Sequence, residues 1–314
     1  MTTEYVKMAK AARRGVSRLT LRQQLQILQI YGDAIQYLSE KAEGAGQESL
    51  TRRWALDYAS ELAIERIRLQ KRLERSIKSN IGKASGYGVQ FDLQMFSILA
   101  ERLGISERFK DVFSQIPLET VRPIMSGELY KDKRSLSERI WCLGDELEKD
   151  MQYIVNRGLI EHKSAVELAK DLEQYVKEPA KRPTTWGKAY PNLRNKKVDY
   201  NAMRLARTSI NHAYQTASIR SAERNPFVEG IEWHSALQHG RTCELCAQRH
   251  GQVFPKDDVP LDHPNGLCTM IPYIPKSLDQ VADELRGWLG GGENERLDEW
   301  YKKYGHYYAT KGVG

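Results

Sequence analysis

The fold of the C-terminal part of the chain is decided by the stretch from Gly230 to Pro275, which reads GIEWHSALQHGRTCELCAQRHGQVFPKDDVPLDHPNGLCTMIPYIP. The residues around Ile231 and Trp233, and again over 269–275, have the composition typical of strands. Pro272 also argues against a helix over the second segment, because proline cannot donate the backbone hydrogen bond that a helix interior needs. The sequence therefore predicts two strands, separated by a loop region that contains three of the four cysteines.

This loop region contains residues spaced as metal ligands. Cys243 and Cys246 are two residues apart, so they can present both thiolates to one metal ion. His263 and Cys268 follow, and the Pro-Asn-Gly turn between them allows them to form a second pair. Three sulfurs and one imidazole suit tetrahedral Zn²⁺, and a site with four protein ligands is structural because no position remains for a reactive water. Reduced thiols packed in a turn and a redox pair remain alternatives. Two other histidines are alternative ligands: His250 and His239.

Outward from this region, the first 178 residues are predicted to be mainly helical. A long amphipathic helix is indicated by apolar residues that recur every three, four or seven positions: Leu50, Trp54, Tyr58, Leu62, Leu69, Leu73 and Ile77. A second helix is predicted from Ile140, Leu143, Leu147, Met151 and Ile154. Cys142 is expected on its buried side. A third helix, over 202–217, is rich in alanine and suited to close packing, and Asn225-Pro226 should end it.

The charge of the chain points to a polyanionic partner. The formal net charge is +7, and the basic excess lies in the first two thirds of the sequence. Residues 179–191 are rich in Pro, Thr, Gly and Lys, which predicts a loop or linker. In and after this linker lies a cluster of cations that is a candidate contact for a polyanion such as nucleic acid: Lys181, Arg182, Lys188, Arg194, Lys196, Lys197, Arg204 and Arg207. The alternative is a solvated linker whose charges only maintain solubility.

These patterns predict a mainly α N-terminal body with long amphipathic helices and a small α+β C-terminal domain with a candidate zinc knuckle. The expected division is a helical body at 1–178, a basic linker with prolines and aromatics at 179–200, the α+β domain at 201–276 and a C-terminal tail at 277–314. No apolar run approaches the roughly 20 residues needed to cross a bilayer, so we expect no membrane partner. Four cysteines are too few for a disulfide scaffold, which favours a reducing compartment.

The stretch from Ala202 to Pro275 resembles the signature region of the phage head morphogenesis family, the minor head proteins that include the F protein of phage Mu. The ordered set that carries the resemblance is Ala206-Arg207-Thr208, Trp233, the Arg-Thr-Cys-x-x-Cys element at 241–246, Gly251, and the His-Pro segment at 263–268. Gly266 stands where the family usually has the first of its last two cysteines, and His239 stands where an acidic residue is common. His263 would then complete the four-ligand set with the three cysteines.

The resemblance implies a non-catalytic minor capsid protein of a tailed phage. Such a protein acts in head assembly and in association with the portal or the packaged DNA. The implied partners are the portal protein, other capsid proteins and double-stranded DNA, bound without sequence preference. The implied location is the capsid interior or the portal vertex of the virion, after assembly in the host cytoplasm.

Two alternatives lead away from a structural role. The Asp262-His263 and Asn265-Gly266 pairs beside the cysteines are similar to the HNH type of nuclease, in which a histidine activates water near a divalent metal. That arrangement needs a second His or Asn on a helix after the strand, whereas prolines occupy the segment at 269–275. A DNA-binding protein unrelated to virions is the other alternative. No phosphate-binding glycine loop or Ser-His-Asp order is recognisable, so we assign no catalytic residue.

Overall fold

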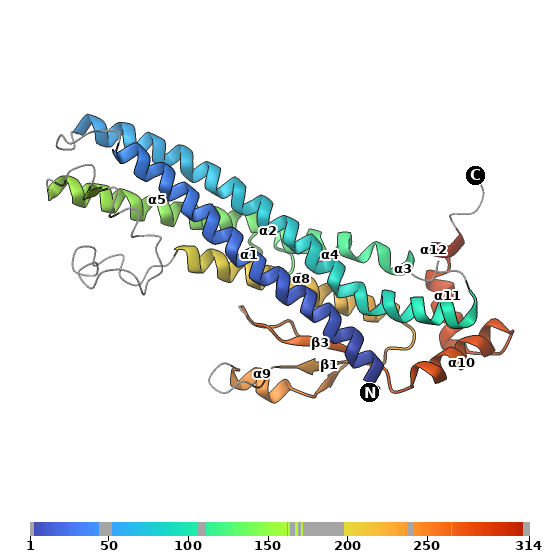
Figure 1. The fold of residues 1–314 in the computed structure, drawn as a ribbon. Helices are drawn as coiled ribbons and strands as arrows, with labels where there is room; N and C mark the ends of the chain where they lie inside the picture. The colour runs from blue at the N-terminus through green and yellow to red at the C-terminus, as the bar shows by residue number, and fades with distance from the viewer. Residues whose placement is uncertain are drawn as a thin grey trace. The chain divides into compact units, whose positions relative to one another are not determined.

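The computed structural model describes residues 3–43, 52–105, 111–161, 198–235, 242–264 and 266–309, together with the isolated positions 163, 167, 168, 171 and 237. Figure 1 shows the order of the elements along the chain. Long helices precede a small three-stranded antiparallel sheet, which confirms the predicted fold class. In the described part of the chain, none of the helices is both long enough and apolar enough to cross a membrane.

The long helices begin with α1 (Thr3–Glu43) and α2 (Arg52–Leu103). They are followed by α3 (Asp111–Ser114), α4 (Ile116–Ser126), α5 (Leu136–Ile160) and α8 (Val198–Arg224). The helices predicted around Leu62, around Leu147 and over 202–217 are all confirmed, and α8 ends immediately before Asn225-Pro226. Leu50 and residues 172–197, which include most of the basic cluster, lie outside the described residues.

The C-terminal elements are β1 (Gly230–His234), α9 (Glu244–Arg249), β2 (Val253–Phe254) and β3 (Thr269–Tyr273). The helices α10 (Leu278–Leu289), α11 (Glu295–Tyr304) and α12 (His306–Ala309) complete the described chain. Both predicted strands are therefore confirmed, while residues 278–309, expected as a tail, form three helices.

Contacts between residues divide the chain into two compact units, each made of segments that are distant in sequence. Unit 1 comprises Met1–Thr20, Ser79–Leu129 and Arg207–Gly314, and unit 2 comprises Leu21–Lys78 and Tyr130–Ala206. The domain boundaries expected at 178, 200 and 276 divide the chain into consecutive segments, and they stay a prediction.

Unit 2 is built from two amphipathic helical segments and α5. The apolar face expected from the sequence is buried, as the low exposure of Tyr58, Leu62, Leu69, Leu73 and Ile77 shows. The Arg66 guanidinium joins α2 to α5, since its Nη1 lies 2.8 Å from Asp145 and 3.1 Å from Glu148. Cys142 is exposed on α5, so its predicted burial is wrong. It lies two residues after Ile140, which at about 100° per residue turns it away from the apolar face of the helix.

Unit 1 has one hydrophobic core to which every part of the unit contributes. The core joins residues from α1, α2, α8, the sheet, α10 and α11: Tyr5, Met8, Phe96, Ala217, Trp233, Leu285 and Leu297. In the sheet, β1 is central and pairs with both β2 and β3. Pro272 lies opposite Ile231 on the edge strand β3, a position that tolerates the missing donor of proline.

The small residues of α8 allow close approach to α2, as the sequence predicts. A Cβ added at Gly88 would lie 2.5 Å from the Cβ of Ala217 and 2.6 Å from the carbonyl oxygen of Tyr214. One turn further along α2, the buried Asp92 accepts hydrogen bonds from the Ser221 hydroxyl and, at 2.7 Å, from the Asn225 amide. Burial raises the pKa of Asp92 to about 6, against the opposing effect of these two hydrogen bonds.

Candidate metal centre

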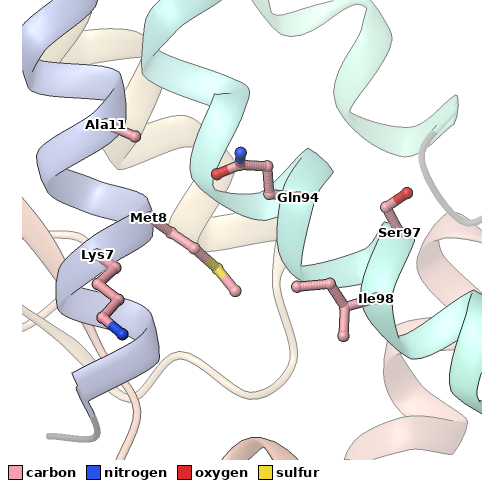
Figure 2. Close-up of a pocket in the computed structure, with 6 residues that line it drawn as sticks. All are labelled: Lys7, Met8, Ala11, Gln94, Ser97 and Ile98. Carbon is pink, nitrogen blue, oxygen red and sulfur yellow. The ribbon is translucent and has the colours of Figure 1, made fainter.

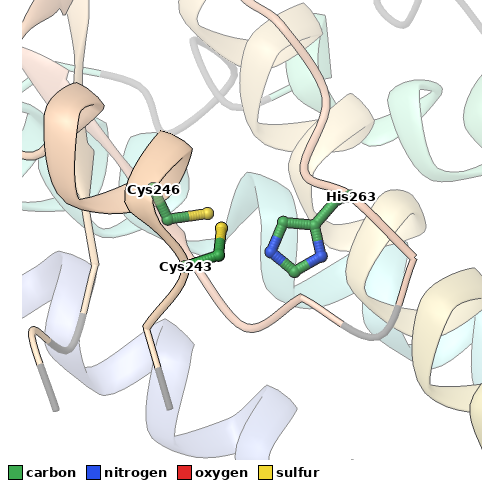
Figure 3. Close-up of side chains that lie close together, drawn as sticks. All are labelled: Cys243, Cys246 and His263. Atoms are coloured by element: carbon green, nitrogen blue, oxygen red, sulfur yellow. The ribbon is translucent and has the colours of Figure 1, made fainter. Parts of the chain in front are cut away.

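The candidate ligands come from the two segments that connect the strands of the sheet. Cys243 immediately precedes α9, and Cys246 lies in its first turn. His263 and Cys268 belong to the segment that leads into β3. Figure 3 shows the two cysteine sulfurs and the His263 imidazole facing one another. Antiparallel pairing of β1 with its neighbours brings together residues that are about 20 positions apart (β1 with β2) and about 40 positions apart (β1 with β3) in sequence.

Three of the four predicted ligands form one group. The donor atoms of Cys243, Cys246 and His263 all lie within 4.8 Å of one another. Cys268 belongs to a second group, with Cys246 and Asp262, that satisfies the same limit. Cys246 is common to both groups, so it links Cys268 to the other two predicted ligands, Cys243 and His263. His250 is in neither group, and its Nδ1 accepts a hydrogen bond from the Ser235 amide at 3.1 Å. His239 lies outside the described residues.

The His263 ring is oriented as a metal-binding imidazole usually is. Its Nδ1 donates to the Pro264 carbonyl oxygen at 3.0 Å, which leaves Nε2 as the acceptor nitrogen. Ligating histidines commonly donate their second ring nitrogen to a backbone carbonyl in this way. The same hydrogen bond raises the pKa of His263, against the lowering effect of burial.

The three cysteines differ in their environments. Cys243 is exposed, and a hydrogen bond from the Cys246 backbone N–H lowers its pKa. Burial raises the pKa of Cys246, and it raises the pKa of Cys268 to about 11. Two buried thiols are thus protonated at neutral pH, and a bound cation would have to displace their protons. Soft sulfur ligands with one imidazole are the donor set that Zn²⁺ prefers, so the residues present fit this metal.

Asp262 organises the segment that bears His263 and Cys268, and sequence spacing did not identify this role. Its side chain is buried, and its two oxygens accept from the backbone N–H groups of His263 at 2.9 Å and Cys268 at 2.8 Å. The Asn211 amide donates to Oδ2 at 3.2 Å, and the Cys246 thiol lies 3.7 Å from Oδ1. The carboxylate therefore fixes the backbone on both sides of the Pro-Asn-Gly turn.

Gly266 makes room for this carboxylate. A Cβ at position 266 would lie 2.2 Å from the Asp262 carboxyl group, so any larger residue would force this carboxylate to move and to lose its hydrogen bonds. Position 266 thus has glycine where the family usually has cysteine, and the buried Asp262 carboxylate occupies the space beside it.

Helix α8 supplies further hydrogen bonds to the segment. His212 Nε2 donates to the Asp262 carbonyl at 2.9 Å. Gln215 accepts from the Asp262 backbone N–H at 3.1 Å and donates to the Cys268 carbonyl at 3.2 Å. These contacts join residues about 50 positions apart. The sequence feature that could have indicated these contacts is the set of amide and imidazole side chains on an otherwise alanine-rich helix.

The first helix also contributes. Arg13 of α1 donates to the side-chain amide oxygen of Asn211 at 2.9 Å and to the backbone carbonyl of Leu267. The chain from Asp262 to Cys268 is thus held by α1, α8 and α9 together, which is the arrangement of a rigid structural element.

Two observations bear on the nuclease alternative. The helix after β3 is α10, and its sequence contains no His or Asn, so it cannot supply the second residue of an HNH site. A hollow of about 380 Å³ in unit 1 is lined by α1 and α2 (Figure 2), and Lys7 is the charged residue among those that line it. That hollow therefore lacks a pair of groups for general acid and base catalysis.

The predicted basic contacts are placed only in part. Arg204 and Arg207 lie on α8, with Arg204 exposed and Arg207 half-buried. Lys181, Arg182, Lys188, Arg194, Lys196 and Lys197 lie outside the described residues. The contact of this cluster with nucleic acid or a portal protein stays a prediction.

Comparison with known proteins supports the family suggested by the motifs. No curated protein and no solved structure matches the chain. The family model described as Phage Mu protein F like protein matches residues 146–270, which is less than half of the chain. The matched region contains most of α5, all of α8 and the Cys and His residues of the candidate metal centre. The match supports a phage head morphogenesis family for this chain and thus a phage head-related protein.

Proposed function

We propose that this protein is a non-catalytic minor component of a tailed-phage head that acts in head assembly and associates with the portal or the packaged DNA. The observation that carries the proposal is the family match over residues 146–270. The segment with the most elaborate side-chain network in unit 1, from Asp262 to Cys268, lies inside this match. In this proposal, the network holds the segment in a fixed structure and has no role in catalysis.

In this role, the segments around α9 and before β3 form a clasp, defined here as residues 242–268. Cys243, Cys246, His263 and Cys268 would hold a structural Zn²⁺, which would stabilise the thiolate forms of the cysteines and join the two segments. Asp262 would remain a positioning residue, since both of its oxygens already accept hydrogen bonds. A clasp fixed from α1, α8 and α9 would present a constant surface to a portal or capsid protein.

The zinc part of the proposal is tested on the purified full-length chain by elemental analysis. We expect about one Zn²⁺ per chain, lost in Cys243→Ser and Cys246→Ser variants and retained in the matched Cys142→Ser control. Cys142 is exposed on α5 in unit 2, so its substitution changes thiol content without touching the clasp. A metal-free parent that is fully folded would contradict a structural zinc site.

The head assignment is tested in cells that produce the phage that encodes this chain. We expect antibodies to detect the protein in purified particles, and we expect deletion of its gene to reduce the yield of DNA-filled heads. Absence from both procapsids and mature heads would contradict the proposal. Metal-dependent DNA cleavage abolished by His263→Ala would instead support a nuclease.

A further inference from the structure

The N-terminal part of α1 carries a row of cations without acidic neighbours in the sequence. Between Glu4 and Asp33 there is no Asp or Glu. Four basic residues in this stretch of unit 1 are exposed: Lys7, Lys10, Arg14 and Arg18. Their spacing of three or four residues places them along one side of the helix. We refer to these four residues as the α1 cationic row.

The α1 cationic row has no carboxylate partner among the described residues, although most of unit 1 is rich in ion pairs. Arg102 pairs with Asp279, Arg224 with Glu119 at 2.5 Å, and both Lys276 and Arg296 with Glu284. Glu4, the acidic residue closest in sequence to the row, lies 3.9 Å from Arg102. The charges of the row are therefore available to an external anion.

The exposed side of this helical segment suits a phosphate backbone better than a protein surface. In residues 4–20, the exposed residues are Glu4, Ser17 and the four cations. The large apolar residues of this segment point inward, as Figure 2 shows for Met8, which extends toward Ile98 of α2. Protein interfaces usually depend on buried aromatic or apolar anchors, and this side offers none among its exposed residues.

The dimensions of the row also fit a nucleic acid strand. Lys7 and Arg18 are eleven residues apart, which corresponds to about 16 Å along a helix axis. Phosphates of one DNA strand rise by 3.4 Å or so each along the duplex axis while the strand winds around it, so a straight row of this length faces some phosphates of one strand and reaches others across a groove. Four long, flexible cations can each reach one phosphate over that distance.

We infer that the α1 cationic row is a binding surface for the phosphate backbone of double-stranded DNA. This inference deepens the proposed function, because it places the DNA contact on α1 as well as, or instead of, the cluster at 181–207. Binding there is sequence-independent and releases counterions from the duplex.

The test measures the affinity of the purified chain for a random-sequence duplex by fluorescence anisotropy at several salt concentrations. One variant neutralises the row: Lys7→Gln, Lys10→Gln, Arg14→Gln and Arg18→Gln. Glutamine is a good helix former, so α1 is retained. The control removes the same charge from scattered exposed positions: Arg122→Gln, Lys131→Gln, Lys149→Gln and Lys302→Gln.

Each phosphate contact contributes about 0.9 to the slope of log K against log salt concentration, so loss of four contacts lowers the slope by about 3.6. We expect this loss in the row variant and a change of less than about 1 in the control. A charge-conserving variant with Lys7→Arg, Lys10→Arg, Arg14→Lys and Arg18→Lys should bind like the parent. Circular dichroism checks that all the variants are folded.

Three results would overturn the inference. The first is a row variant whose slope of log K against log salt concentration equals that of the parent. The second is a control variant whose slope falls as much as that of the row variant. The third is binding to poly-glutamate that is as tight as binding to DNA and that also depends on the row. If binding is lost only on neutralising Arg194, Lys196 and Lys197, the row is excluded but a DNA-binding head protein is not. Failure of this inference and failure of the proposed function are thus distinguishable.

Discussion

The buried Asp92 should make unit 1 more stable at mildly acidic pH than at neutral pH. Burial raises the pKa of Asp92 from an ordinary value of 3.8 to about 6. Because the folded state then binds the proton more tightly than the unfolded state, protonation stabilises the fold. Stability should therefore rise as the pH falls from 7 to 4, the reverse of the usual behaviour of a carboxylate in an ion pair.

The magnitude follows from the difference between the two pKa values. A difference of about two units corresponds to about 3 kcal/mol between full ionisation and full protonation. Between pH 7 and pH 5, the expected gain is about 1.3 kcal/mol, since the folded state becomes largely protonated while the unfolded state remains ionised. Ser221, Asn225 and the nearby Lys256 favour the ionised form and are already included in this pKa.

The assay is urea unfolding, followed by circular dichroism at pH 5, 6 and 7, on the parent and on an Asp92→Asn variant. Asparagine keeps an acceptor oxygen toward the Asn225 amide and places its own NH2 group beside the Ser221 hydroxyl, which can accept from it, but it cannot ionise. The free energy of unfolding of the parent relative to the variant should increase by about 1.3 kcal/mol from pH 7 to pH 5. Glu101→Gln, which removes an exposed carboxylate from the same helix, is the control. A difference that does not change with pH, or that falls toward pH 5, would refute the reasoning.

Two further predictions concern the packing and the ends of helices in unit 1. Gly88→Ala should lower the free energy of unfolding by about 1–3 kcal/mol through its clash with Ala217, whereas Gly86→Ala, which meets no atom within 4 Å, should raise it by about 0.5–1 kcal/mol. Equal effects of these two substitutions in chemical denaturation would contradict the close crossing of α2 and α8. Ser277→Ala removes the capping box of α10, in which Ser277 and Gln280 bond each other's backbone N–H groups, and should cost about 1 kcal/mol. An unchanged thermal midpoint would show that the cap does not stabilise this helix.

The elements that were predicted correctly are those with a signal in local spacing. The period of apolar residues located α2, α5 and α8, and the Cys-x-x-Cys pattern with the His-Pro turn located the group of Cys243, Cys246 and His263. The prediction that Cys142 is buried was wrong because one residue changes the direction of a helical side chain by about 100°, so Cys142 points away from the buried Leu143.

The features that could not be predicted depend on partners far away in the sequence. Asp262 is recognised as an organising residue only when Asn211 and Gln215, about 50 positions earlier, are brought beside it. The shared core of unit 1 likewise joins Tyr5 to Trp233 and Leu297, and no local pattern encodes such an association. The need for glycine at 266 follows from the Asp262 carboxylate and not from the turn sequence alone.

The contact of Arg13 with the carbonyl of Leu267 has a consequence for synthesis on the ribosome. The two residues are separated by 254 positions, so the first helix emerges long before the segment that it will hold. Until that segment leaves the exit tunnel, Tyr5 and Met8 of the nascent chain lack many of the apolar partners that cover them in the finished protein. Unit 1 can therefore complete its core only after its C-terminal segments have been synthesised, and a fragment cloned from residue 201 onward would lack Arg13 and Tyr5, which contact that core and the segment before β3.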